Sequence, residues 1–112
     1  MQEKVVRCYI HEQAFLARIA ACQLRTPQVA VTLGRHILLW NTDRRSFMAR
    51  PAWVRHELCH VRQFKRYGTL LFLLLYFWES LRRGYTGNRF EVEARRAEAD
   101  TQPLDLFVFP SC

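Results

Sequence analysis

The sequence predicts a single small α+β domain, and two patterns carry this prediction. Apolar residues recur with helical spacing in several segments, whereas two short runs rich in Val, Ile and Leu lie between residues 28 and 41. The 112 residues are enough for one modest hydrophobic core and too few for two domains of ordinary size. We therefore expect residues 1–112 to form one domain.

The first predicted element is an amphipathic helix from His11 to Leu24. Its apolar side chains follow mostly three- and four-residue spacing, at Phe15, Leu16, Ile19, Ala20 and Cys22. The stretch "QVAVTLGRHILLWN" then predicts a β-hairpin, or at least two short strands, around Gly34-Arg35. The following "NTDRRSFMARPAW" predicts a polar connector.

The second predicted helix runs from Pro51 to Tyr67. A first-turn proline loses no internal hydrogen bond, and Gly68 suits the end of a helix. A third helix, described below, follows Gly68, and after it "RFEVEARRAEAD" predicts a fourth helix with Asn88 as its N-cap. The apolar tail "TQPLDLFVFPSC" is expected to pack back on the domain as an extended segment.

The third predicted helix, "TLLFLLLYFWESLRR", contains an unbroken apolar run from Leu70 to Trp78. As a helix, this run covers only about half of the ~30 Å hydrocarbon core of a bilayer, so it does not predict a transmembrane span. It predicts a buried central helix. Peripheral membrane contact through residues 70–78 is the alternative, because basic residues flank the run at Lys65, Arg66, Arg82 and Arg83.

Charge and composition restrict partners and location only loosely. The net charge is +7, but the basic residues are spread along the chain and no nucleic-acid motif is present, so we expect no specific nucleic-acid partner. The start lacks the apolar core of a secretory signal, which favours a cytoplasmic protein that is free or membrane-associated. The cysteines, at 8, 22, 59 and 112, form no CxxC pair and predict free buried thiols. Nothing indicates an oligomeric state.

The stretch "HELCH", residues 56–60, carries the chemistry. Residues four apart share one face of a helix, so His56 and His60 can bind one ion at about 2.0–2.1 Å. Glu57, rotated by about 100°, can reach a water bound to that ion and act as general base. Zinc lowers the pKa of such a water to about 7, which allows peptide hydrolysis. The alternative is a chance HExxH string on an exposed basic helix.

Two histidines hold zinc poorly, and a catalytic site usually has three protein ligands. "NRFEVEAR" offers Glu91 and Glu93 on the fourth predicted helix, which can turn back alongside the second. Either glutamate gives the set of two histidines and one carboxylate that is found in hydrolytic zinc sites.

"HELCHVRQFKRYG" followed by "GYTGNRFEVEAR" resembles the minimal members of the gluzincin-like HExxH zinc metallopeptidases. The resemblance implies a zincin-like domain, Zn²⁺ as cofactor and a peptide or protein substrate. In the Glu-x-x-Ala pattern of these families, "EVEA" makes Glu91 the third ligand, with Glu93 as the alternative. It also implies that "HILLWN" or "VAVTL" is an edge strand for substrate, and that Tyr85 donates to an oxyanion, although a surface turn tyrosine is the plainer alternative.

The sequence departs from the family pattern at Arg95, where Asp or Asn commonly steadies a zinc-binding histidine. The departure bears on activity more than on metal binding, and Asp43 and Glu79 are candidates for the missing support. Gln63 is expected to serve packing or hydrogen bonding, and Cys59 to be a buried thiol. Cys112 is a hypothetical fourth ligand.

Two functions follow from these patterns. The first is a zinc peptidase with ligands His56, His60 and Glu91 and with Glu57 as the base that later returns its proton as an acid. The second is a zinc-containing but catalytically inactive binding or membrane-peripheral module.

Overall fold

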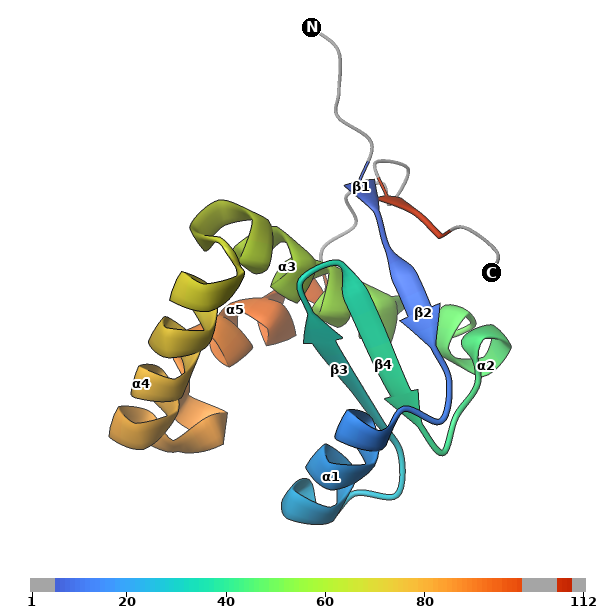
Figure 1. The fold of residues 1–112 in the computed structure, drawn as a ribbon, viewed down its shortest axis with the longest axis horizontal. Helices are drawn as coiled ribbons and strands as arrows, with labels where there is room; N and C mark the ends of the chain where they lie inside the picture. Colours follow the sequence, from blue (N-terminus) through green and yellow to red (C-terminus); the bar gives the residue numbers. More distant parts are fainter. Residues whose placement is uncertain (1–5, 100–106, 110–112) are drawn as a thin grey trace, which may run out of the picture.

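A three-stranded sheet lies at the centre of the computed structural model, which describes residues 6–99 and 107–109 (Figure 1). Its strands are β2 (Tyr9–His11), β3 (Val29–Leu33) and β4 (His36–Trp40), in the order β2-β4-β3. Strand β2 runs parallel to β4, and β3 runs antiparallel to it. Strand β3 is therefore an edge strand of this sheet. A separate parallel pair consists of β1 (Val6–Arg7) and β5 (Phe107–Val108).

The predicted hairpin is confirmed as β3 and β4, joined at Gly34-Arg35. Gly34 has a φ of 64°, a left-handed conformation that glycine adopts without steric cost and that suits a tight hairpin turn.

Helices cover both faces of the sheet. Helix α1 (Phe15–Leu24) packs on one face and α3 (Pro51–Tyr67) on the other. Side chains alternate along β4 in agreement with this arrangement: Ile37 and Leu39 join the core below α3, whereas Leu38 and Trp40 pack against α1. The sheet therefore fixes the position of α3, the helix that carries "HELCH".

Three phenylalanines hold the remaining helices against α3. They come from α3, from α4 (Thr69–Gly87) and from α5 (Arg89–Ala97), and form one buried cluster of Phe64, Phe72 and Phe90. The ring centroids of Phe64 and Phe72 lie 4.5 Å apart, and those of Phe72 and Phe90 lie 4.9 Å apart. Asn88 caps α5 as predicted, since its side chain accepts a hydrogen bond from the Phe90 amide. The predicted α+β class is confirmed.

Two predicted element boundaries are wrong. The first helix begins at Phe15 and not at His11, because residues 9–11 form strand β2, with Ile10 buried opposite Ile37. The connector contains a short helix, α2 (Arg44–Met48), whose N-cap Asp43 accepts a hydrogen bond from the Ser46 amide at 2.7 Å. A side-chain cap of this kind stabilises a helix that its polar composition does not predict.

The burial predicted for the third helix is also wrong. Helix α4 is not a buried central helix, because its buried side chains are those of Phe72 and Glu79, whereas most of its large apolar residues are exposed. Helix α1 buries Ala17 and Ala21, while its larger apolar residues point outward. Small side chains allow the helix axis to approach the sheet closely, which explains why the alanine face of α1 packs inward.

No helix in residues 6–99 or 107–109 has both the length and the apolar character needed to cross a bilayer. Cys8 and Cys59 are free buried thiols, as predicted, but Cys22 is exposed. Of the tail, β5 is extended as expected, and the Arg44 guanidinium donates to the Phe109 carbonyl at 2.5 Å. Cys112 lies outside the described residues.

Candidate metal centre

His56, His60 and Glu91 converge at the junction of α3 and α5. The two histidines lie one turn apart on α3, with ring centroids 5.1 Å apart, and α5 brings Glu91 against them. Their potential ligand atoms all lie within 4.8 Å of one another. His56 Nε2 is 3.1 Å from one Glu91 oxygen, and His60 Nε2 is 3.2 Å from the other. The three residues that the sequence suggested as ligands thus lie together.

The chemistry of this donor set fits zinc. Two imidazole nitrogens and one carboxylate oxygen are a common catalytic set, and tetrahedral bonds of ~2.1 Å separate ligand atoms by about 3.4 Å. The distances of 3.1 and 3.2 Å are close to that separation. The site is also buried, since His60 is 6% and Glu91 3% exposed. The set can therefore hold a metal ion with little rearrangement.

Hydrogen bonds fix the orientation of both imidazoles. His56 Nδ1 lies 2.7 Å from a Glu98 carboxylate oxygen, and His60 Nδ1 lies 2.8 Å from the amide oxygen of Gln63. An ionised carboxylate and an amide oxygen only accept hydrogen bonds, so each Nδ1 carries a proton. Each Nε2 is thereby directed towards Glu91, which is how metal-binding histidines are usually positioned.

The support expected in place of Arg95 reaches His56 from Glu98, which the sequence did not identify, and His60 from Gln63, for which the sequence predicted packing or hydrogen bonding. Glu98 follows α5 by one residue, and no spacing rule linked it to His56. Asp43 caps α2, and Glu79 accepts from the Arg89 amide at 3.2 Å, so neither supports a histidine here. Arg95 donates to the Thr86 carbonyl and thus joins α5 to the end of α4.

Glu93, the alternative ligand, occupies a different position. It accepts a hydrogen bond from Gln63 Nε2 at 2.7 Å, and the Cys59 thiol lies 3.7 Å from the same oxygen. Gln63 thus connects Glu93 to His60. Burial and the nearby Glu93 carboxylate raise the pKa of the Cys59 thiol to about 12, which keeps it protonated. Glu93 and Cys59 therefore lie beside the site and not among the converging ligand atoms.

Glu57 is buried beside the histidines. The hydroxyl of Thr32, on the edge strand β3, donates to its carboxylate at 2.7 Å. Burial raises the pKa of Glu57, while the two histidines and the Thr32 hydrogen bond act against that shift. A carboxylate with a raised pKa is a stronger proton acceptor, which is the property that a general base requires.

The histidines and Glu91 shift one another's pKa values. Burial disfavours the charged imidazoles, but the Glu91 hydrogen bond and the Glu57 charge raise the pKa of His56 to about 9 and also raise that of His60. Burial likewise disfavours the Glu91 carboxylate, yet hydrogen bonds from both histidines hold its pKa well below the usual range. In the metal-free chain, protons on the two histidine Nε2 atoms therefore stabilise the Glu91 carboxylate, as a bound cation would.

Two tyrosines border the site. Tyr76, which no sequence motif indicated, donates to the second Glu91 oxygen at 2.5 Å. Tyr85 is 44% exposed and lines the same groove as His56 and Glu57. Burial and the Glu91 carboxylate raise the pKa of both phenols, so both keep their protons. Gly84, with a φ of 72° and a ψ of 170°, breaks α4 just before Tyr85 in a conformation that favours glycine.

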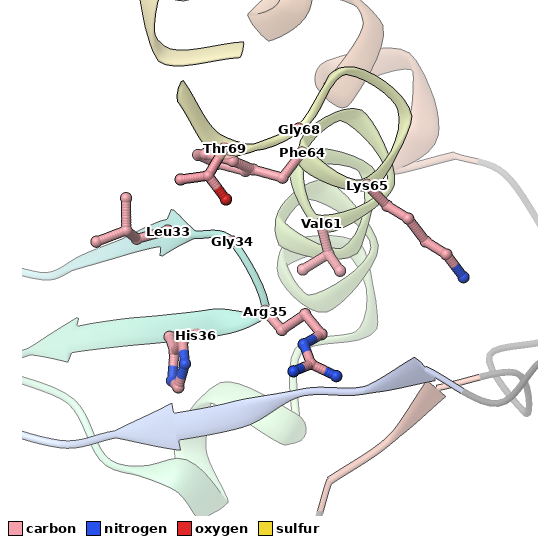
Figure 2. Close-up of a pocket in the computed structure, with 9 residues that line it drawn as sticks. All are labelled: Leu33, Gly34, Arg35, His36, Val61, Phe64, Lys65, Gly68 and Thr69. Carbon is pink, nitrogen blue, oxygen red and sulfur yellow. The ribbon is translucent and has the colours of Figure 1, made fainter. Parts of the chain in front are cut away.

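The site opens into an apolar groove of about 470 Å³. Residues of α1, β3 and α4 form its walls, and His56, Glu57, His60 and Glu91 lie within it. A second hollow of about 560 Å³ lies between the hairpin turn and the end of α3, with Leu33, Arg35, Val61 and Thr69 in its lining (Figure 2). This second hollow has no carboxylate or thiol in its lining, so it offers no comparable metal site.

No protein-family model, curated protein or solved structure matches the chain. The function of the chain therefore has to be inferred from its fold and from the geometry of the site.

Proposed function

We propose that the chain is a small zinc-dependent peptidase of the gluzincin-like kind. One observation carries the proposal: two histidines of an HExxH helix and a glutamate of a later helix converge, with Glu57 beside them and an open groove above. His56, His60 and Glu91 would hold the ion. A bound zinc polarises a carbonyl and lowers the pKa of a water molecule.

The chain's own residues supply the remaining functions. Glu57, oriented by the Thr32 hydroxyl, accepts a proton from the attacking water and later delivers it to the leaving amine. Tyr85 keeps its phenolic proton and can donate it in a hydrogen bond to the developing oxyanion. These roles need no disulfide, thiol or further cofactor.

The edge strand β3 gives the groove a means of binding an extended peptide. Residues Val29 to Leu33 line the groove, and Thr32 connects this strand to Glu57. An extended substrate can pair with a strand edge through main-chain hydrogen bonds, while its side chains enter pockets. Because the walls include Leu16, Leu24 and Leu73, we expect a preference for apolar side chains.

The test compares the wild type with Glu57→Gln, which removes the base but keeps an oxygen that can accept from Thr32. Zinc per chain and cleavage of an unfolded protein or peptide library are measured for both. We expect equal zinc content and cleavage only by the wild type. Glu93→Gln is the matched control and should keep both zinc and cleavage, since Glu93 lies outside the converging ligands.

A zinc-containing but inactive binding module is the second candidate, and the exposure of the apolar residues of α4 favours it. The same measurements separate the two. Stoichiometric zinc without cleavage by the wild type supports the module, whereas absence of zinc from the wild type contradicts both.

A further inference from the structure

Helix α4 presents a long apolar stripe to solvent. Leu70, Leu74, Phe77 and Leu81 are between 59% and 73% exposed, and Trp78 is 58% exposed. With about 100° of rotation per residue, the first four side chains lie on the side of the helix opposite the buried Phe72 and Glu79, and Trp78 lies on the flank of this stripe. Monomeric soluble proteins rarely expose a continuous apolar surface of this kind unless it has a partner.

Helix α1 adds a second apolar stripe across the same groove. Phe15 is 71% and Ile19 44% exposed, on the side opposite Ala17 and Ala21. Leu16 and Leu24 of α1 and Leu73 of α4 line the groove that contains the candidate metal site. In Figure 1, α4 lies along the left side of the molecule and α1 at the bottom. We call the exposed side chains of the two helices the α1/α4 face, defined by Phe15, Leu16, Ile19, Leu24, Leu70, Leu71, Leu73, Leu74, Phe77, Trp78 and Leu81.

The exposed charged residues within segments 15–25 and 65–87 have one sign. Exposed basic residues lie on or beside both helices, at Arg18, Arg25, Lys65, Arg66 and Arg82, with Lys65 and Arg66 at the end of α3 just before α4. Arg83 is not counted with them, because its guanidinium lies 3.7 Å from the Glu79 carboxylate on the opposite side of α4. The only acidic residue in segments 15–25 and 65–87 is Glu79, which is 5% exposed. A second copy of the chain on this face would bring like charges together, and the chain carries a net charge of +7. An anionic lipid surface matches both the apolar stripe and the basic residues.

We propose that the α1/α4 face binds the surface of an anionic lipid bilayer. The helices would lie in the plane of the interface, with leucine and phenylalanine side chains among the acyl chains and the basic residues near the lipid phosphates. Trp78 has the amphipathic ring that is enriched at this depth. The groove would then open beside the bilayer. If the proposed peptidase activity is correct, its substrates are polypeptide segments near the membrane surface, and this last point rests on that activity.

The test is co-sedimentation of the full chain with vesicles of phosphatidylcholine alone or with about 30% phosphatidylserine. We expect at least about tenfold stronger binding to the anionic vesicles, which weakens as salt is raised. Leu74→Glu/Phe77→Glu should lower the binding by about tenfold or more, because it places two charges in the apolar stripe. Met48→Glu, a change at an exposed apolar residue of α2, is the matched control and should bind like the wild type.

Brominated lipid provides a second measurement that does not depend on the folding of the double variant. It should quench the tryptophan fluorescence of the wild type, and Trp78→Phe should remove most of this quenching. Failure of the wild type to bind anionic vesicles, or equal binding to both vesicle types, overturns the proposal. A dimer that the double variant dissociates, without vesicle binding by the wild type, assigns the face to a second copy instead. None of these measurements needs zinc or substrate, so their failure leaves the proposed peptidase untouched.

Discussion

Exchanging Glu91 or Glu93 for glutamine tests which glutamate completes the metal site. Both oxygens of Glu91 face an imidazole Nε2, at 3.1 and 3.2 Å, so Glu91→Gln removes the only anionic ligand of the set. Structural zinc sites contribute about 10–16 kcal/mol through four ligands, or roughly 3 kcal/mol for each ligand. That corresponds to a zinc affinity lower by about a hundredfold or more.

Glu93→Gln is the matched change on the same helix. Glu93 contacts Gln63 and not the converging ligand atoms, and a glutamine at this position keeps an oxygen that can accept from Gln63 Nε2. The zinc affinity of Glu93→Gln should remain within about threefold of that of the wild type. Loss of a hydrogen bond made directly to a metal ligand lowers metal affinity by more than this, and Glu93 makes no such bond. Competition against a chromophoric chelator measures both affinities. A large loss in Glu93→Gln together with zinc retention in Glu91→Gln would refute the assignment.

Three further predictions concern the support of the site. Gln63→Leu should lower zinc affinity by about 10- to 100-fold in the same chelator competition, since it removes the acceptor that orients His60; unchanged affinity would exclude this role. In the metal-free chain the pKa of His56 is raised to about 9, compared with about 6.5 for a histidine in the unfolded chain. Protonation of His56 therefore stabilises the fold fully below pH 6.5, and this stabilisation is lost as the pH rises towards 9. Denaturant unfolding should show a decrease of up to about 3 kcal/mol across that interval, and a smaller one in Glu91→Gln, whereas a flat profile would contradict the His56–Glu91 pairing. Gly84→Ala should destabilise the chain by about 1–3 kcal/mol in thermal or denaturant unfolding, because alanine is strained at a φ of 72° although no atom lies near the added Cβ; a neutral effect would mean that the break in α4 is not needed.

The sequence contained strong signals for the elements that carry the candidate site. Helix α3 begins at Pro51 and ends before Gly68, as expected, because a proline and a glycine act locally on the backbone. The spacing of His56 and His60 places them on one face of any helix, whatever surrounds it. The capping residue Asn88 likewise marked the start of α5 and hence the position of Glu91. Such features depend on neighbouring residues only, so they can be predicted without knowledge of the packing.

Contacts between distant segments could not be predicted in this way. Glu98 and Tyr76 reach the site because the phenylalanine cluster fixes α4 and α5 against α3. Comparison with the HExxH pattern suggested that a residue supporting a histidine is missing at Arg95, but the carboxylate that supports His56 is that of Glu98, just beyond α5. Hydrogen-bond partners far apart in sequence depend on where each helix lies, which periodicity does not determine.

The sequence by itself determined the α+β class, the hairpin, the bounds of α3 and the residues that could bind a metal, because each follows from local backbone preferences or helical spacing. Only the tertiary structure decided that Glu91 and not Glu93 faces the histidines, since a rotation of about 200° on α5 separates the two side chains. It also decided that α4 and α1 leave their large apolar side chains exposed. Hydrophobic periodicity identifies an apolar face, but burial depends on whether another element is present to cover it.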